Sequence, residues 1–181
     1  MKSKVFFATF LEKLLYIVAA NVMTVLVKII LNVIIIPIVD EAMRDSTDVA
    51  KANALKIYAA VYVIAFIIFL AILVIKNPST RATYLNDTYG KEYSFKNDLL
   101  RISPLPLLCA SALMALPMSL VLAIFGDIKV VPFFFVPYYS MWEIVRNPWL
   151  SFGIMTILTA VAVMIFSLIA FMIWEKNRLR K

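Results

Sequence analysis

The sequence predicts an all-α, polytopic integral membrane protein with four transmembrane helices. Hydrophobic residues make up 64% of its 181 residues and charged residues only 16%, whereas soluble domains carry about 25% charged residues. Four separate apolar stretches are each long enough to cross the hydrocarbon core of a membrane as a helix, which takes about 20 residues. We therefore expect a single transmembrane domain, 1–181, without a separate soluble domain.

The segment before the first apolar stretch has an amphipathic pattern. Apolar side chains alternate with lysines and other polar residues over 2–13, which predicts an interfacial helix lying on the membrane surface. A secretory signal peptide is the alternative, because Val18-Ala19-Ala20 resembles a cleavage site. The apolar sequence continues for nineteen residues beyond Ala20, as far as Val39, and this favours a retained span.

The four predicted spans are nearly free of charge. Lys28 is the single charged residue within them, and Pro117, near the middle of the third span, predicts a kink. The spans cover about 14–39, 57–75, 102–125 and 148–174.

The three connections differ in composition. The first, 40–56, is polar and acidic and reads as a helical link, whereas 76–101 is a basic loop with several tyrosines. The third, 127–146, contains an aromatic, uncharged stretch that is too short to span a membrane and holds two prolines. Two interpretations of this aromatic outer loop remain open: it lies in the outer interface, or it dips into the membrane as a re-entrant segment.

The distribution of Lys and Arg predicts the orientation. Of the 18 such residues, twelve fall in the N-terminal arm, the 76–101 loop and the C-terminal end, and five fall in the other two loops. By the positive-inside rule, both termini and 76–101 are cytoplasmic in the plasma membrane. The net charge of +7 then reflects attraction to anionic headgroups on the cytoplasmic side, and nucleic acid is not an expected partner.

Composition also argues against most catalytic chemistry. The chain has no histidine and one cysteine, Cys109, so the commonest general base and a principal zinc ligand are missing. No motif for nucleotides, phosphates, metals or nucleophilic catalysis is present. We therefore expect no enzyme activity, no catalytic residue, no cofactor and no metal site.

The strongest functional lead is a polar stripe along the first span. Asn21, Thr24, Lys28 and Asn32 fall within about 80° of each other on a helix, and Lys28 lies ~3 Å from the membrane midplane if the span is centred. A lysine there needs water, a partner or protein interior around it. The stripe either lines a wet, anion-attracting cavity or forms a hydrogen-bonded seam between helices or subunits.

No other span offers Lys28 an acidic partner. The nearest candidates are Asp127 and Glu143 in the aromatic outer loop. Either one reaches Lys28 only if that loop dips into the membrane.

The fourth span carries a line of small residues. Such lines permit close approach between membrane helices, so we interpret them as packing positions: Gly153, Thr156, Ala160 and Ser167.

These patterns favour a non-enzymatic role. We expect a subunit or accessory component of a membrane complex, with another membrane protein or a second copy of the chain as its partner. The alternative is a small transporter or channel-like protein that uses the stripe of Lys28, Asn21 and Asn32.

Overall fold

The computed structural model describes residues 2–76, 104–126 and 135–178, and over these ranges the protein is helical without strands. Four helices are long and apolar enough to cross a membrane, which confirms the predicted fold class. The elements are α1 (Lys2–Ile30), the π-helix η1 (Leu31–Ile35), α2 (Ile36–Ala42), α3 (Asp48–Lys76), α6 (Pro104–Phe125), α7 (Val136–Val145) and α8 (Pro148–Arg178).

The first span is one continuous helical rod made of α1, η1 and α2. The predicted N-terminal helix over 2–13 forms, but it continues into the span without a break and makes up the first turns of α1. The π turn precedes Pro37, and the N–H of Ile36 bonds back to the carbonyl of Leu31. A proline ring clashes with the carbonyl four residues earlier in an α-helix, and a widened turn relieves that clash.

The link between the first two spans is mostly helical, as expected from its composition. The rod ends at Ala42, and α3 begins at Asp48, so 43–47 form the turn. The N–H of Ala50 donates to the side-chain oxygen of Thr47 (3.4 Å), which caps α3. The predicted second span, 57–75, therefore lies within a longer helix that extends nine residues further toward the turn.

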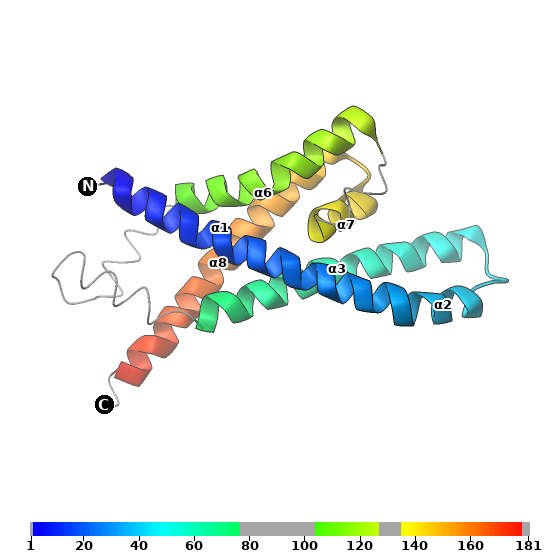
Figure 1. Cartoon of the computed structure of the whole chain (residues 1–181), viewed down its shortest axis with the longest axis horizontal. Coiled ribbons are helices and arrows are strands. Elements are labelled where there is room, and N and C mark those ends of the chain that lie inside the picture. The colour runs from blue at the N-terminus through cyan, green and yellow to red at the C-terminus, as the bar shows by residue number, and fades with distance from the viewer. Residues whose placement is uncertain (1, 77–103, 127–134, 179–181) are drawn as a thin grey trace.

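The remaining predicted spans match α6 and α8. The start of the third span, 102–103, and the loop 77–101 lie outside the described residues. Pro117 lies inside α6, and Figure 1 shows this helix changing direction along its length. The fourth span begins at Pro148, as predicted, and its helix continues to Arg178.

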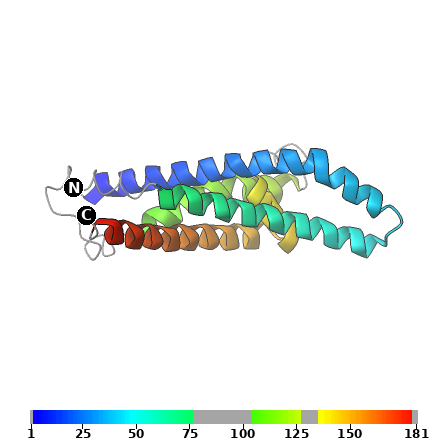
Figure 2. The same ribbon diagram turned by 90° about the horizontal axis from the view of Figure 1, so that it is seen from below.

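The long helices form two antiparallel pairs. Figure 1 shows α1 beside α3 and α6 beside α8, and the two pairs diverge on the right, where the short helix α7 lies between them. Both chain termini lie at one end of the bundle in Figures 1 and 2. We call this the terminal end, and we call the opposite end, with the α2–α3 and α7–α8 connections, the turn end.

Part of the predicted aromatic outer loop is thus a helix inside the bundle. Val136, Pro137, Tyr138 and Ser140 of α7 are buried, so this part of the loop packs among the long helices; 127–134 lie outside the described residues. Arg146 ends α7 in a left-handed conformation (φ 59°), and its N–H donates to the carbonyl of Trp142 (2.6 Å). Asn147 then caps α8 through its side-chain oxygen, which accepts from the N–H of Leu150 (3.0 Å).

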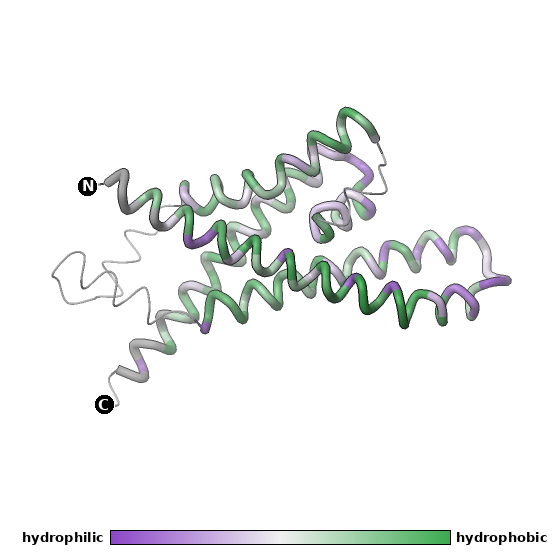
Figure 3. Tube along the Cα trace, in the orientation of Figure 1, coloured by the Kyte–Doolittle hydropathy of each residue, from purple (hydrophilic) through white to green (hydrophobic). Residues whose placement is uncertain are grey.

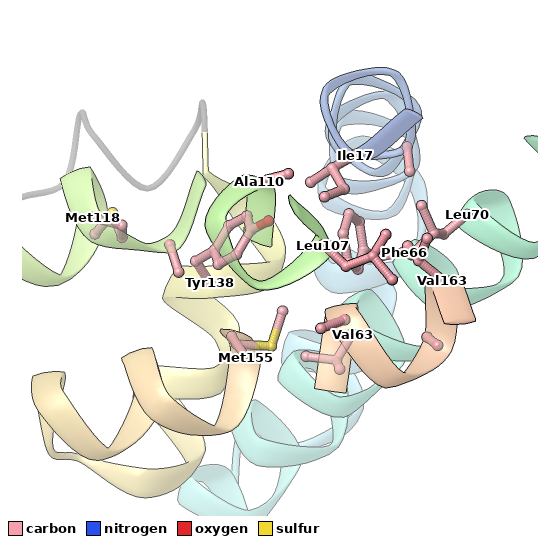
Figure 4. Close-up of a cluster of buried hydrophobic side chains, with 14 of the residues drawn as sticks. Ile17, Val63, Phe66, Leu70, Leu107, Ala110, Met118, Tyr138, Met155 and Val163 are labelled. Atoms are coloured by element: carbon pink, nitrogen blue, oxygen red, sulfur yellow. The ribbon is translucent and has the colours of Figure 1, made fainter. Parts of the chain in front are cut away.

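The core lies where α7 meets the long helices. Phe66 and Leu70 of α3 pack with Ile17 of α1 and Val163 of α8, and Tyr138 reaches into the same cluster (Figure 4). The rings of Phe66 and Tyr138 are 6.0 Å apart in a tilted arrangement. Because lipid is as apolar as these side chains, close packing rather than expulsion from water stabilises such a core.

The long helices are largely hydrophobic along their length, and hydrophilic residues are frequent near the α2–α3 turn (Figure 3). Many large apolar side chains of these helices are exposed. The spans differ in the share of their apolar residues that is buried inside the protein. The apolar window of the first span is 6% buried inside the protein, against 33–39% for the other three. The first span therefore contributes least to its own bundle.

Candidate functional site

The predicted polar stripe runs from the protein interior to its surface. Thr24 is fully buried and Asn21 is 6% exposed, whereas Lys28 is half-buried and Asn32 is exposed. The Thr24 hydroxyl donates to the carbonyl of Ala20 in its own helix (2.8 Å). The four residues thus share a helix face, but they do not share one environment.

Lys28 occupies an aromatic cage built by two other helices. Its Nζ lies 5.9 Å from the ring centroid of Tyr62 on α3 and 5.7 Å from that of Tyr139 on α7. An ammonium within about 6 Å of an aromatic face is attracted to the negative side of the ring. The cage therefore gives the lysine partners inside the protein, at the junction of three helices.

A hydrogen bond ties Tyr62 back to the stripe. Its hydroxyl donates to Oδ1 of Asn32 at 3.3 Å, and Asn32 lies in η1. The π turn inserts one extra residue into the helical register, so it sets the direction in which Asn32 faces relative to Lys28. Relief of the proline clash and formation of the site therefore depend on the same turn.

Glu143 supplies negative charge near the cage. It lies one turn after Tyr139 on α7, and its carboxylate acts electrostatically on both Lys28 and Tyr62. The insertion of α7 between the helix pairs brings it there. Of the two acidic candidates expected from the sequence, Glu143 is thus placed near Lys28, while Asp127 lies outside the described residues.

The cage is closer to the turn end than to the terminal end. The charge-free part of α3 lies between Lys56 and Lys76. Tyr62, whose ring faces Lys28, is six residues from Lys56 and fourteen from Lys76, or about 9 Å and 21 Å along the helix.

A second lysine of the same helix, Lys13, is more deeply buried than Lys28, and the sequence analysis did not predict this. Lys13 is 3% exposed; its ammonium pairs with Glu12 at 2.8 Å and lies 5.1 Å from the ring centroid of Tyr16. Tyr16 lies three residues after Lys13, and residues three apart lie on the same helix face. This spacing was the feature of the sequence that could have predicted the contact.

The predicted packing line of α8 separates into two parts. Thr156, Ala160 and Ser167 are buried, at 5–8% exposure. Gly153 is half-buried, and a Cβ built there would meet no heavy atom within 4 Å. Gly153 therefore does not serve close helix approach in this structure.

The cage is suited to hold an ammonium group in place. Within the described ranges, no group of three His, Cys, Asp or Glu residues is placed to hold a metal ion. No protein-family model, curated protein or solved structure matches this chain. Functional interpretation therefore rests on the geometry of the chain itself.

Proposed function

We propose that this protein is a non-enzymatic subunit or accessory component of a membrane complex, and that the Lys28 cage fixes α7 between the two helix pairs. The observation that most directly supports this proposal is the position of the Lys28 ammonium over the rings of Tyr62 and Tyr139. These rings come from helices far apart in sequence, so one side chain joins α1, α3 and α7.

The partners of Lys28 support a structural role over a solute-binding one. Its charge faces two ring faces and the field of Glu143, which together offset part of its attraction for a free anion. Thr24 and Asn32 likewise have hydrogen bonds within the protein. A polar stripe whose side chains bond within the protein agrees with the interpretation of the stripe as a hydrogen-bonded seam between helices.

The uncovered first span supports an association role. Its apolar window is 6% buried, so most of the residues in that window are available to lipid, to another membrane protein or to a second copy. The exposed side chains on this helix are large and apolar, with Leu15, Val22 and Leu26 between 54% and 59% exposed.

Cross-linking in native membranes tests this proposal. A photoactivatable residue replacing Leu26 on the open face should give a discrete cross-linked protein, whereas one replacing the buried Met155 should give none. The proposal predicts that Lys28→Met weakens that cross-link, and that Lys56→Met, which removes an exposed lysine of α3, leaves it intact. Cross-links to lipid alone at Leu26 would contradict the association role.

The second candidate is a small transporter or channel-like protein, favoured by the course of the stripe from Asn21 in the interior to Asn32 at the surface. An anionic solute entering from the turn end would meet Asn32 and then Lys28. Uptake of an anion into liposomes holding the purified protein, lost in Lys28→Met but not in Lys56→Met, would favour this candidate over the scaffold.

For location, we propose the plasma membrane with the terminal end in the cytoplasm. The four apolar helices indicate a membrane protein, and the excess of Lys and Arg in the terminal arms and the 76–101 loop supports the orientation.

A further inference from the structure

The part of the first rod nearest the turn end is not covered by the other long helices. Neither η1 nor α2 contains a buried residue, and their main contacts are within the rod itself. Figure 1 shows this part of the rod beside α3 alone, where the two helix pairs have diverged. Its exposed side chains are large and apolar, with Ile30, Val33 and Ile34 between 54% and 71% exposed. Polar groups on this surface therefore face whatever surrounds the protein in the membrane.

Lys28 and Asn32 leave hydrogen-bond donors unused at this surface. Lys28 is half-buried against two rings, but it makes no hydrogen bond or ion pair with any residue that the structure describes. Asn32 is exposed and accepts from the Tyr62 hydroxyl through Oδ1, while its amide nitrogen donates to no residue in the described ranges. An ammonium has three N–H donors and an amide nitrogen has two. The unused donors lie about one helical turn apart on the same face of the rod.

Both side chains lie below the level of the nearest charged residues toward the turn end. Each interacts with Tyr62, which is about 9 Å along α3 from Lys56. On the rod itself, the first charged residue beyond Asn32 is Asp40, eight residues or about 12 Å away. Ionisable groups at such depth are costly unless they are paired, most often with an opposite charge. The open side of Lys28 therefore needs an acceptor from outside the described part of the chain.

We propose that a transmembrane helix of a different protein, carrying an aspartate or glutamate within its span, docks on this surface and pairs with Lys28. The inference rests on the proposed function, because it names the partner in that membrane complex. A carboxylate has two acceptor oxygens, so one such residue can accept from the Lys28 ammonium and from the Asn32 amide.

Charge distinguishes a different protein from a second copy. None of the four apolar spans of this chain contains an aspartate or glutamate. A second copy in the same orientation would present its own Lys28 at the same depth, and like charges facing each other disfavour association. A helix with an acidic residue instead supplies the opposite charge.

The cage prepares Lys28 for such a partner. Glu143 acts electrostatically on Lys28 from α7, but the two form no ion pair. The rings of Tyr62 and Tyr139 hold the ammonium in one place, which lowers the entropy lost when a partner binds. Lys28 thus contacts its own protein on one side and leaves N–H donors for a second protein on the other.

Site-specific cross-linking in native membranes tests the inference. A photoactivatable residue replaces Ile35, which is 39% exposed and lies three residues after Asn32, and the product is identified by mass spectrometry. We expect a different membrane protein with an acidic residue in one of its spans. Lys28→Met should lower the yield about 3- to 30-fold, the range for one polar contact between membrane helices, and Lys56→Met should not. Changing the partner's acidic residue to its amide should cause a similar loss, with no further loss in the combined variant.

Two controls separate pairing from stability and from pairing within the chain. Tyr139→Leu removes one ring of the cage but keeps the ammonium, so the product should persist; an equal loss in Tyr139→Leu and Lys28→Met would show a purely structural role and overturn the inference. Asp127→Asn should show no coupling to Lys28→Met in the unfolding of the purified protein. Coupling there would assign Lys28 to its own loop and likewise overturn the inference.

The identity of the product separates this inference from the proposed function. A product that contains only a second copy, or a partner without an acidic residue in its spans, overturns the inference and leaves the association role intact. The same holds if Ile35 captures no protein while Leu26 does. Cross-links to lipid alone at both positions contradict the proposed function itself.

Discussion

Replacing Lys28 with methionine tests whether the aromatic cage stabilises the fold. Methionine keeps a long, unbranched side chain but removes the ammonium that lies 5.9 Å and 5.7 Å from the rings of Tyr62 and Tyr139. Packing along the stem is therefore conserved, and the measured change reports mainly on the charge.

The expected change in unfolding free energy differs between a caged lysine and one that lacks partners. A cation–π contact contributes about 0.5–1 kcal/mol when exposed and ~2 kcal/mol when desolvated, so two contacts to the half-buried Lys28 stabilise the fold by about 1–3 kcal/mol. A lysine without such partners in the membrane would instead destabilise by about 2.5–3.5 kcal/mol. The sign of the change in unfolding free energy thus distinguishes a caged lysine from a lipid-facing one.

Reversible unfolding in mixed detergent micelles provides the measurement. We expect Lys28→Met to lower the unfolding free energy by about 1–3 kcal/mol, and a double-mutant cycle with Tyr139→Leu to give a coupling of about 0.5–2 kcal/mol. Lys56→Met is the matched control and should change stability little. Greater stability in Lys28→Met, or zero coupling to Tyr139, would refute the cage.

Three further predictions concern other contacts. Tyr62→Phe removes the hydrogen bond to Asn32 (3.3 Å) and should lower stability by about 0.5–1.5 kcal/mol in the same unfolding assay, whereas an unchanged value would show that the bond is not stabilising. Gly153→Ala should raise stability by about 0.4–1 kcal/mol, because its Cβ would meet no atom within 4 Å; a loss would indicate a close contact at that face. With Cys109 replaced by serine, Ser46→Cys should react with an impermeant maleimide from outside whole cells and Lys176→Cys only after lysis, and labelling of both from outside would contradict the orientation.

Much of the fold could be predicted because a membrane restricts the choices. A charge-free stretch such as 57–75 must be helical in lipid, since every backbone group needs an internal partner. The extension of α3 back to Asp48 was harder to predict from the sequence, because polar residues near a membrane surface form helices or turns equally well. The helix over 2–13 could be predicted but its continuity with the first span could not, since amphipathicity does not report whether a helix bends where it meets the next one.

Only part of the Lys28 site could be predicted from the sequence. The lysine stands out because charge in a span is costly, but its partners Tyr62 and Tyr139 lie on other helices, and the register between helices is not encoded in any local pattern. Glu143 became relevant only once α7 turned inward. Two prolines and a short aromatic stretch left an interfacial segment and a re-entrant one equally compatible with the sequence.

The length of the first rod has its own consequence. Its apolar part, 14–39, has 26 residues and measures about 39 Å, compared with a hydrocarbon core of about 30 Å. At a tilt of about 40°, the steepest commonly seen, it covers ~30 Å along the bilayer normal. An upright rod therefore suits only a thick bilayer, and the balance between tilt and bilayer thickness should make the stability of the protein depend on acyl-chain length.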